Sequence, residues 1–391
     1  MDKHRHFDHA LLFVILALMG FGLIMVYSAS SITSMTEMSD GQYYFKRQLL
    51  WVGIGLLAMF TFSNIPYRRL ENIATPFLLV SIAFLILVLF APTVGGSHRW
   101  LRIAGQGFQP SELAKIAFLI YMARSISSRQ DRITELIRGV LPDLAVMTVL
   151  FLLILKEPNL STAAIIAFTY FMMLFLGNGS IAHLAWMGAA GVMTIIGLIF
   201  QEGYRMRRFL AFLDPWGASK TAGYHIIQSL VAIGSGGLWG LGLGQSRQKF
   251  FILPERHTDF IYAIVCEELG LFGGMLVIGL FFLLIWRGYY IAMRSPDLFG
   301  FLLASGITSL IAAQALINLG VVLSVLPTTG VTLPFISYGG SSVIFLATLM
   351  GILLNISRFG ANHNALLDHR RRPLSKRLTA IPDRTGPRRR T

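Results

Sequence analysis

The chain consists of long runs of apolar residues separated by short polar segments. Ten of these runs reach or approach the roughly 20 residues that a membrane-crossing helix needs. The pattern therefore predicts an all-α polytopic membrane protein with about ten transmembrane helices. The runs cover residues 10–28, 48–63, 75–92, 110–127, 139–156, 159–177, 181–201, 259–286, 298–324 and 340–358.

The composition agrees with this prediction. Apolar residues make up 54% of the 391 residues and charged residues only 13%, about half the usual share in soluble proteins. So few charges cannot cover a globular surface, so the excess apolar surface must face lipid. This excludes a disordered protein, a disulfide-stapled secreted domain and a coiled coil. The single cysteine, Cys266, permits no intrachain disulfide.

The orientation follows from the basic residues, which favour the cytoplasmic ends of short loops. A cytoplasmic N-terminus places most of them inside, and both termini are then cytoplasmic. Lys3 and Arg5 before the first run, with small residues at 28–30 after it, also fit a signal peptide, but nine runs follow, so we favour a retained signal-anchor. The inside set is Lys3, Arg5, Arg68, Arg69, Arg124, Arg129, Arg132, Arg138, Arg287, Arg294 and the basic tail.

One segment departs from this distribution. Residues 202–258 form a long loop on the outer face with seven Lys or Arg, and apolar stretches within it predict short helices on or in the membrane surface. We assign residues 1–360 to the membrane domain and 361–391 to a basic, disordered cytoplasmic tail next to anionic lipid. From Arg358 onward, ten Lys or Arg and two Asp account for +8 of the net charge of +14. A charge run alone does not indicate nucleic-acid binding, so we expect no nucleic-acid partner.

The segment 253–260, LPERHTDF, ends the outer loop and opens the eighth run. Asp259 is either a helix N-cap together with Thr258, or a carboxylate at the membrane surface that accepts a proton from a sugar hydroxyl. Partial burial would raise its pKa and make it a better base. Glu255 and His257 are close enough to tune it, share a proton or bind a cation, and the spacing leaves these roles open.

Two further carboxylates lie deeper in the same run. Ionisable groups inside a bilayer are costly and are therefore functional candidates, which applies to Glu267 and Glu268. Glu267 lies eight residues after Asp259 and so falls on nearly the same helix face. Lys115, in the fourth run, is a candidate partner, although local pairing with Glu112 is the alternative.

Other polar groups gather between runs on the outer face. Arg99 is either an interfacial anchor or a phosphate contact, and Glu157 is either a snorkelling end or part of an outer site. Residues 326–342 contain two prolines and three glycines, so we expect buried irregular backbone that lines a cavity. Arg and Lys suit phosphates, so these groups indicate a phosphorylated headgroup on a lipid tail. They do not separate catalysis from transport.

Several motifs, in this order, resemble the SEDS family of bacteria, the FtsW/RodA/SpoVE proteins. The likeness covers roughly residues 8–360. The motifs are VYSAS at 26–30, RWL at 99–101, QPSELAK at 109–115, FLDPW at 212–216, GYHIIQS at 223–229, IGSGG at 233–237, PERHTDF at 254–260 and LPFISYGGSS at 333–342.

The resemblance implies a peptidoglycan glycosyltransferase that polymerises lipid II at the outer face of the bacterial cytoplasmic (inner) membrane. The donor is the growing glycan on undecaprenyl pyrophosphate, the transfer inverts the anomeric centre, and Asp259 is the catalytic general base. The resemblance implies no certain cofactor. A divalent cation, Mg²⁺ or Mn²⁺, would help the pyrophosphate to depart, and its ligands stay unassigned. Substrate contacts are expected from Arg99, Lys115, Glu157, Arg208, Gln228, Ser229, Lys249, Glu255, His257, Thr258, Ser337, Tyr338 and Ser341.

The implied partners are a class B penicillin-binding protein (the transpeptidase), other division proteins and membrane lipids. The PTTGVTLP stretch at 327–334 resembles the division branch, FtsW, which acts at the septum, whereas Arg256 resembles the elongation branch, RodA. A lipid II flippase and a scaffold for the penicillin-binding protein are the alternative functions. Asn159 stands where the family usually has an acidic residue, so Glu157 is the candidate to take over any role there.

Overall fold

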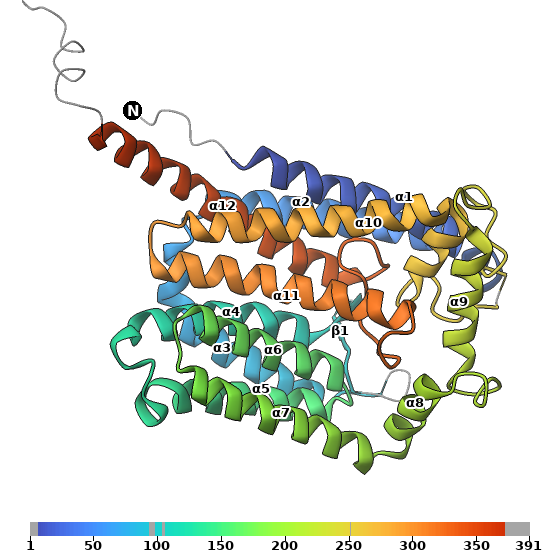
Figure 1. Ribbon diagram of the computed structural model, residues 1–391. Helices are drawn as coiled ribbons and strands as arrows, with labels where there is room; N and C mark the ends of the chain where they lie inside the picture. Colours follow the sequence, from blue (N-terminus) through green and yellow to red (C-terminus); the bar gives the residue numbers. More distant parts are fainter. Residues whose placement is uncertain (1–6, 94–97, 104–105, 251, 372–391) are drawn as a thin grey trace, which may run out of the picture.

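The computed structural model describes residues 7–93, 98–103, 106–250 and 252–371. It is a helical bundle with one two-stranded antiparallel sheet (Figure 1). The elements are α1 (His9–Met38), α2 (Tyr43–Asn64), α3 (Arg68–Val88), β1 (Leu101–Ile103), β2 (Gln106–Phe108), α4 (Pro110–Ser128), the 3₁₀ turn η1 (Gln130–Arg132), the π turn η2 (Leu136–Val140), α5 (Leu141–Lys156), α6 (Leu160–Leu176), α7 (Ile181–Gln201), α8 (Gly203–Leu213), α9 (Tyr224–Gly236), α10 (Ile261–Met293), α11 (Leu298–Val322) and α12 (Gly340–Arg371).

Each of the ten predicted spans corresponds to a helix of the bundle. Among the described residues, eight helices are long and apolar enough to cross a membrane. The two others are α6, an apolar helix of 17 residues, and α4, which carries Glu112, Lys115 and Arg124. The chain is therefore a multi-pass membrane protein.

Three helices extend well past the predicted spans. α1 continues to Met38, α10 to Met293 and α12 to Arg371. The apolar runs mark only the part of a helix that lies in hydrocarbon, whereas helical hydrogen bonding continues through polar residues into the interface. Residues 361–371 of the predicted tail are accordingly helical, and residues 372–391 lie outside the described part of the chain.

Close helix packing depends on small residues in the bundle. α2 and α12 form the most extensive helix pair, and a side chain at Gly351 would overlap the backbone of Met59. Small residues allow backbones to approach where lipid offers no hydrophobic driving force between helices. Most residues of α4, of α11 and of the first part of α12 are buried, so these helices form the centre of the bundle.

Figure 1 shows different parts of the chain at the two ends of the bundle. The start of α1 and the end of α12 lie at one end, whereas α8 and α9 lie at the opposite end, with α9 running across the bundle. The segment 202–258 thus contains two short helices, as predicted, and their position at the membrane surface stays a prediction. The separation of the termini from this loop fits the predicted orientation.

Helix α10 has a break one third of the way along. Gly270 has φ of +64°, which interrupts the helical ladder. The chain 237–242 supplies the missing partners: Leu241 N–H donates to the Glu267 carbonyl at 3.0 Å, and Gly242 N–H donates to the Glu268 carbonyl at 2.9 Å. Gly240 has φ of +82°, and a side chain there would overlap the Glu268 backbone. Glycine is required at this close approach.

Candidate functional site

Asp259 lies in the turn that leads into α10. The N-cap of that helix is Phe260, and no side-chain cap bond is formed there among the described residues. Of the two alternatives for Asp259, a helix N-cap with Thr258 is therefore excluded. The turn is closed instead by main-chain bonds, in which the N–H groups of Thr258 and Phe260 donate to the Glu255 carbonyl at 3.2 and 3.1 Å. The side chain of Asp259 is therefore not used to start the helix.

Three consecutive carbonyls hold this turn in place. Tyr338 N–H donates to the His257 carbonyl at 2.9 Å, and the Ser337 hydroxyl donates to the Thr258 carbonyl at 2.6 Å. The side-chain amide of Asn318, in α11, donates to the Asp259 carbonyl at 2.7 Å. We call these three contacts the carbonyl clamp. It fixes the backbone of Asp259 through its carbonyl and makes no use of its carboxylate.

The segment between α11 and α12 provides most of the clamp. It is irregular and buried in its second half, which includes Val331, Leu333, Phe335 and Ile336. The prediction for 326–342 is confirmed in part, because the backbone is irregular up to Gly339 and residues 333–337 are buried, whereas α12 already begins at Gly340. That this segment lines a cavity stays a prediction. Irregular backbone inside a membrane protein must be satisfied by other protein groups. Buried Gln48, in α2, does this by donating to the Ser337 carbonyl at 3.3 Å and accepting from Gly339 N–H at 3.4 Å.

The electrostatic environment of Asp259 favours its protonated form. Burial, reinforced by the charge of Glu255, raises the pKa of Asp259 to about 7, although Arg208 and Arg99 oppose the rise. Within the described residues no hydrogen bond or ion pair to its carboxylate is formed. A carboxyl group with a pKa near neutral pH, and with unoccupied oxygens, is suited to accept and release a proton.

Arg99 joins this site to the α5–α6 junction. Its Nε donates to the Glu157 carbonyl at 2.9 Å, and its guanidinium also bonds the Pro158 carbonyl. Burial lowers the pKa of Arg99, and the charges of Tyr204, Glu157 and Asp259 counter this effect while Arg208 adds to it. Arg99 is thus anchored by carbonyls, and its charge opposes the rise in the pKa of Asp259.

Glu157 is the second carboxylate of this region. It is fully buried, and its carboxylate oxygens form no hydrogen bond that meets distance and angle criteria within the described part of the chain. Burial raises the pKa of Glu157 to about 8, against the effects of Arg99 and the Ser111 hydroxyl. Neighbouring Asn159 has a structural role, because its Oδ1 accepts a hydrogen bond from Thr162 N–H at 3.3 Å and so caps α6.

An aromatic cluster borders the turn. The His257 ring lies 4.9 Å from that of Tyr44 and 5.8 Å from that of Tyr338, and the two tyrosine rings are 5.1 Å apart. The rings link α1–α2 to the clamp. Aromatic faces of this kind also pack well against sugar rings.

Three predicted substrate contacts have structural partners instead. Lys115 forms a buried ion pair with Glu112 at 2.7 Å, the local alternative, and does not pair with Glu267. The Ser229 hydroxyl donates to the Val322 carbonyl at 2.8 Å and ties α9 to α11. Lys249 is the third, and its buried ammonium group faces Glu268 at 3.9 Å.

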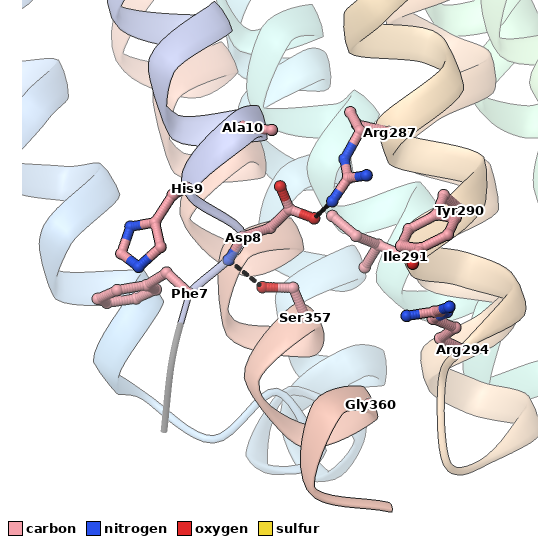
Figure 2. Close-up of a pocket in the computed structure, with 10 residues that line it drawn as sticks. All are labelled: Phe7, Asp8, His9, Ala10, Arg287, Tyr290, Ile291, Arg294, Ser357 and Gly360. Carbon is pink, nitrogen blue, oxygen red and sulfur yellow. Dashed lines mark hydrogen bonds and ion pairs between the residues drawn. The ribbon is translucent and has the colours of Figure 1, made fainter. Parts of the chain in front are cut away.

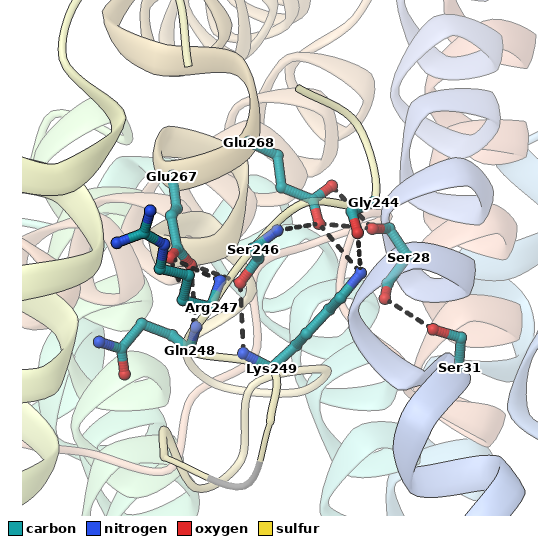
Figure 3. Close-up of polar contacts among 9 residues, drawn as sticks. All are labelled: Ser28, Ser31, Gly244, Ser246, Arg247, Gln248, Lys249, Glu267 and Glu268. Atoms are coloured by element: carbon teal, nitrogen blue, oxygen red, sulfur yellow. Dashed lines mark hydrogen bonds and ion pairs between the residues drawn. The ribbon is translucent and has the colours of Figure 1, made fainter. Parts of the chain in front are cut away.

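Glu267 and Glu268 anchor the outer loop, as Figure 3 shows. Glu267 accepts from Arg247 N–H at 2.9 Å and from the Ser246 hydroxyl. Glu268 accepts from the Ser28 hydroxyl of α1 at 2.6 Å as well as facing Lys249. Both carboxylates therefore have structural partners, and these contacts hold the loop against α1 and α10.

Some of the remaining predicted substrate contacts lie around Asp259, and others lie elsewhere in the bundle. The structure brings Glu255, His257, Thr258, Ser337 and Tyr338 together around Asp259, and Arg208 of α8 is exposed and close enough to act on its charge. Gln228 is half-buried on α9. Ser341 is buried at the start of α12, and its hydroxyl lacks a hydrogen-bond partner among the described residues.

Sequence reasoning missed three members of the site. Asn318 and Gln48 hold the clamp, and Tyr204 lies against Arg208 with the guanidinium 5.9 Å from its ring centre. The first two are polar residues inside apolar runs. A polar side chain inside an apolar run was the reason for choosing Glu267 as a candidate. The same criterion could have identified Asn318 and Gln48.

A cation site made of protein ligands alone is not found in the described part of the chain, where no group of three or more His, Cys, Asp or Glu side chains converges. Mg²⁺ is commonly held by one or two carboxylates together with substrate phosphates. The separate Glu157 and Asp259 carboxylates would fit only that kind of shared binding. The residues present thus provide a proton acceptor and cationic side chains at one end of a membrane bundle.

Comparison with known proteins places this arrangement in a family. Residues 9–362 match the FtsW/RodA/SpoVE family model, described as cell cycle protein. The chain is 44% identical to stage V sporulation protein E of Bacillus subtilis (90% of this chain and 97% of that protein). It is 42% identical to the probable peptidoglycan glycosyltransferase FtsW of Trichlorobacter lovleyi (90% and 93%).

Two solved structures are similar over most of their length. One comes from a study entitled "Structural coordination of polymerization and crosslinking by a peptidoglycan synthase complex", with a TM-score of 0.77, 29% identity and coverage of 90% of this chain and 98% of that chain. The other is the rod shape determining protein RodA of Thermus thermophilus, with a TM-score of 0.67, 29% identity and coverage of 90% and 97%.

Proposed function

This chain belongs to the FtsW/RodA/SpoVE family, and from that premise we propose that it is a peptidoglycan glycosyltransferase that polymerises lipid II at the outer face of the cytoplasmic membrane. The observation that carries the proposal is the free carboxylate of Asp259, fixed by the carbonyl clamp, with Arg99 and Arg208 acting on its charge. A general base must be held firmly and must have its oxygens available.

The reaction assigns a task to each group. The 4-hydroxyl oxygen of the acceptor sugar attacks the anomeric carbon of the donor glycan as its proton passes to Asp259. The bond from that carbon to the pyrophosphate oxygen breaks, and the pyrophosphate leaves with the electron pair. Attack opposite the leaving group converts an α-linked donor to a β-linked product. Arg208, which is exposed, and Arg99 offer positive charge to the departing phosphates.

The intramembrane charges argue against a flippase. A transporter needs a polar path through both leaflets, whereas Lys115, Glu267 and Glu268 are engaged with neighbours in the described structure. These pairs leave no chain of free polar groups among them. The enzyme therefore explains the placement of Asp259 better than transport does.

The partner and branch belong to the same proposal. We expect a class B penicillin-binding protein to supply the transpeptidase, as the similarity to a synthase complex supports. Identities to sporulation and division relatives are comparable, 44% and 42%, and the 327–334 stretch favours the division branch and the septum. Septal location of a fluorescent fusion would support that branch, and uniform lateral location would contradict it.

The test is glycan polymerisation from purified lipid II in detergent, with the cognate class B partner present. Wild type is compared with Asp259→Ala, and Asp40→Ala serves as a matched control because Asp40 is a partly exposed carboxylate paired with Lys46. We expect polymer from wild type and the control and none from the folded Asp259 variant. Lack of polymer from an intact wild-type complex, with lipid II translocation in liposomes, would establish the flippase instead.

A further inference from the structure

A pocket lies at the opposite end of the bundle from Asp259. It has a volume of about 260 Å³ and is formed where the start of α1 meets the end of α10 and residues 357–360 of α12. This is the end that the basic residues assign to the cytoplasm. The pocket is lined by Phe7, Asp8, His9, Ala10, Arg287, Tyr290, Ile291, Arg294, Ser357 and Gly360, all drawn in Figure 2.

Two arginines, Arg287 in α10 and Arg294 at its C-cap, provide positive charge in this pocket. The guanidinium of Arg287 lies 4.5 Å from the centre of the Tyr290 ring, and that of Arg294 lies 4.0 Å from it. Figure 2 shows both on the α10 side of the pocket, with Phe7 and His9 on the other side. A ring shared by two cations holds their planar groups in place.

The single carboxylate of the pocket does not neutralise both cations. Asp8 caps α1 by accepting from Leu11 N–H at 2.9 Å and pairs with one nitrogen of Arg287. The Arg287 Nε is buried without a hydrogen-bond partner in the described structure, and no carboxylate there pairs with exposed Arg294. Guanidinium groups carry five N–H donors in a fork that matches phosphate oxygens. The pocket therefore has unused donors and excess positive charge.

The surroundings favour a lipid rather than a soluble anion. Tyr290 packs against both arginines, and Trp286, which precedes Arg287 in the sequence, is 55% exposed. Such aromatic residues mark the depth of lipid headgroups. A second hollow, lined by Phe7, Leu12, Met59, Phe60, Ser63 and Leu354, shares Phe7 with the first. Phe60 in that hollow is 67% exposed on the lipid-facing surface of α2. A polar hollow beside an apolar one suits a headgroup followed by an acyl chain.

We propose that this pocket binds the phosphate of an anionic phospholipid of the cytoplasmic leaflet, with Arg287 and Arg294 as the phosphate ligands. Basic pockets between helices on the cytoplasmic side are typical sites for such headgroups. Binding would link α1, α10 and α12 at the end remote from the catalytic turn. The inference does not depend on the polymerase activity.

The experiment uses the full-length protein in detergent after removal of copurified lipid. Native mass spectrometry measures the retention of added dioleoyl phosphatidylglycerol against dioleoyl phosphatidylcholine, and thermal unfolding is recorded in parallel. The test variant is Arg294→Gln, because Arg294 is free of ion pairs in the described structure whereas Arg287 also binds Asp8. Arg69→Gln is the matched control, an exposed arginine at the same end of the bundle but outside the pocket.

We expect wild type and the Arg69 variant to prefer phosphatidylglycerol, and the Arg294 variant to bind it about fivefold more weakly, the loss of one cation near a headgroup. The thermal stabilisation by this lipid should fall in parallel. Equal retention of both lipids by wild type, or an unchanged affinity in the Arg294 variant, would overturn the proposal. Stabilisation by millimolar inorganic phosphate that requires Arg294, with none from phosphatidylglycerol, would also overturn it in favour of a soluble anion.

Discussion

The pH dependence of polymerisation tests the central role given to Asp259. A pKa of about 7 means that about one tenth of the carboxyl groups are ionised at pH 6 and about nine tenths at pH 8. If the ionised form is the base, the initial rate should rise about eightfold to tenfold between these values. An ordinary exposed aspartate would be ionised throughout, and the rate would then not depend on this group.

Glu255→Gln provides the perturbation. Burial is the main cause of the raised pKa, and the charge of Glu255 is the next. Removing that charge should lower the pKa of Asp259 and move the acidic limb of the profile to lower pH, without returning it to 3.8, because burial remains. Glu202→Gln is the control, since Glu202 is an exposed carboxylate at the start of α8 in the same outer loop.

The assay is the initial rate of glycan formation from lipid II, measured from pH 5.5 to pH 8.5 in buffers of constant ionic strength. Glu157 also has a raised pKa, about 8, so the profile is repeated with Glu157→Gln. A limb near pH 7 that survives in this variant belongs to Asp259. A flat profile in wild type, or an equal shift with Glu202→Gln and Glu255→Gln, would refute the reasoning.

Four further results are expected. Asp259→Asn should unfold at a higher temperature than wild type at pH 8. The pKa of Asp259 is 3.8 in the unfolded chain and about 7 in the folded chain, so its ionisation destabilises the fold as the pH rises between these values. Differential scanning fluorimetry at pH 5 and pH 8 measures whether the variant gains stability over wild type only at the higher pH. Asn318→Leu should lower kcat by one to two orders of magnitude with little change in KM, since it releases the Asp259 backbone; an unchanged kcat would show that the clamp is dispensable. Gly240→Ala should give little folded protein, whereas Gly234→Ala, where a Cβ meets nothing within 4 Å, should fold normally; size-exclusion yield compares them. Ser229→Ala should cost about 1 kcal/mol of stability while keeping activity, and a selective loss of activity would restore Ser229 as a substrate contact.

The spans were predictable because apolar length is a direct property of the sequence. The run at 181–201 coincides with α7, since hydrophobic thickness sets the number of residues that a helix needs. Helix ends were less predictable. The break in α10 at Gly270 depends on pairing with residues 237–242, and no local pattern specifies which distant loop meets a helix.

The members of the site were partly predictable, whereas their partners were not. Asp259 stood out as a carboxylate at a helix start, but its carbonyl is held by Asn318, 59 residues later, and apolar periodicity contains no information on that pairing. Lys115 had two candidate partners, and the three-residue spacing to Glu112 on one helix decided the matter. Lys249 was assigned to substrate because a loop cation suits phosphate, yet folding brings it to Glu268.

The carbonyl clamp has a consequence for how this enzyme can vary during evolution. The clamp holds His257 and Thr258, like Asp259, through their main-chain carbonyl oxygens. Every amino acid has this oxygen, so the clamp does not depend on which side chains stand at 257 and 258. A substitution of His257 or Thr258 therefore keeps the main-chain bonds of the clamp and loses only the contacts of the side chain itself, which include the packing of His257 on Tyr44 and Tyr338 and the bond from Thr258 to Glu255. A single inserted residue would instead shift every pairing in the turn. The sequence here can therefore drift in composition far more readily than in length.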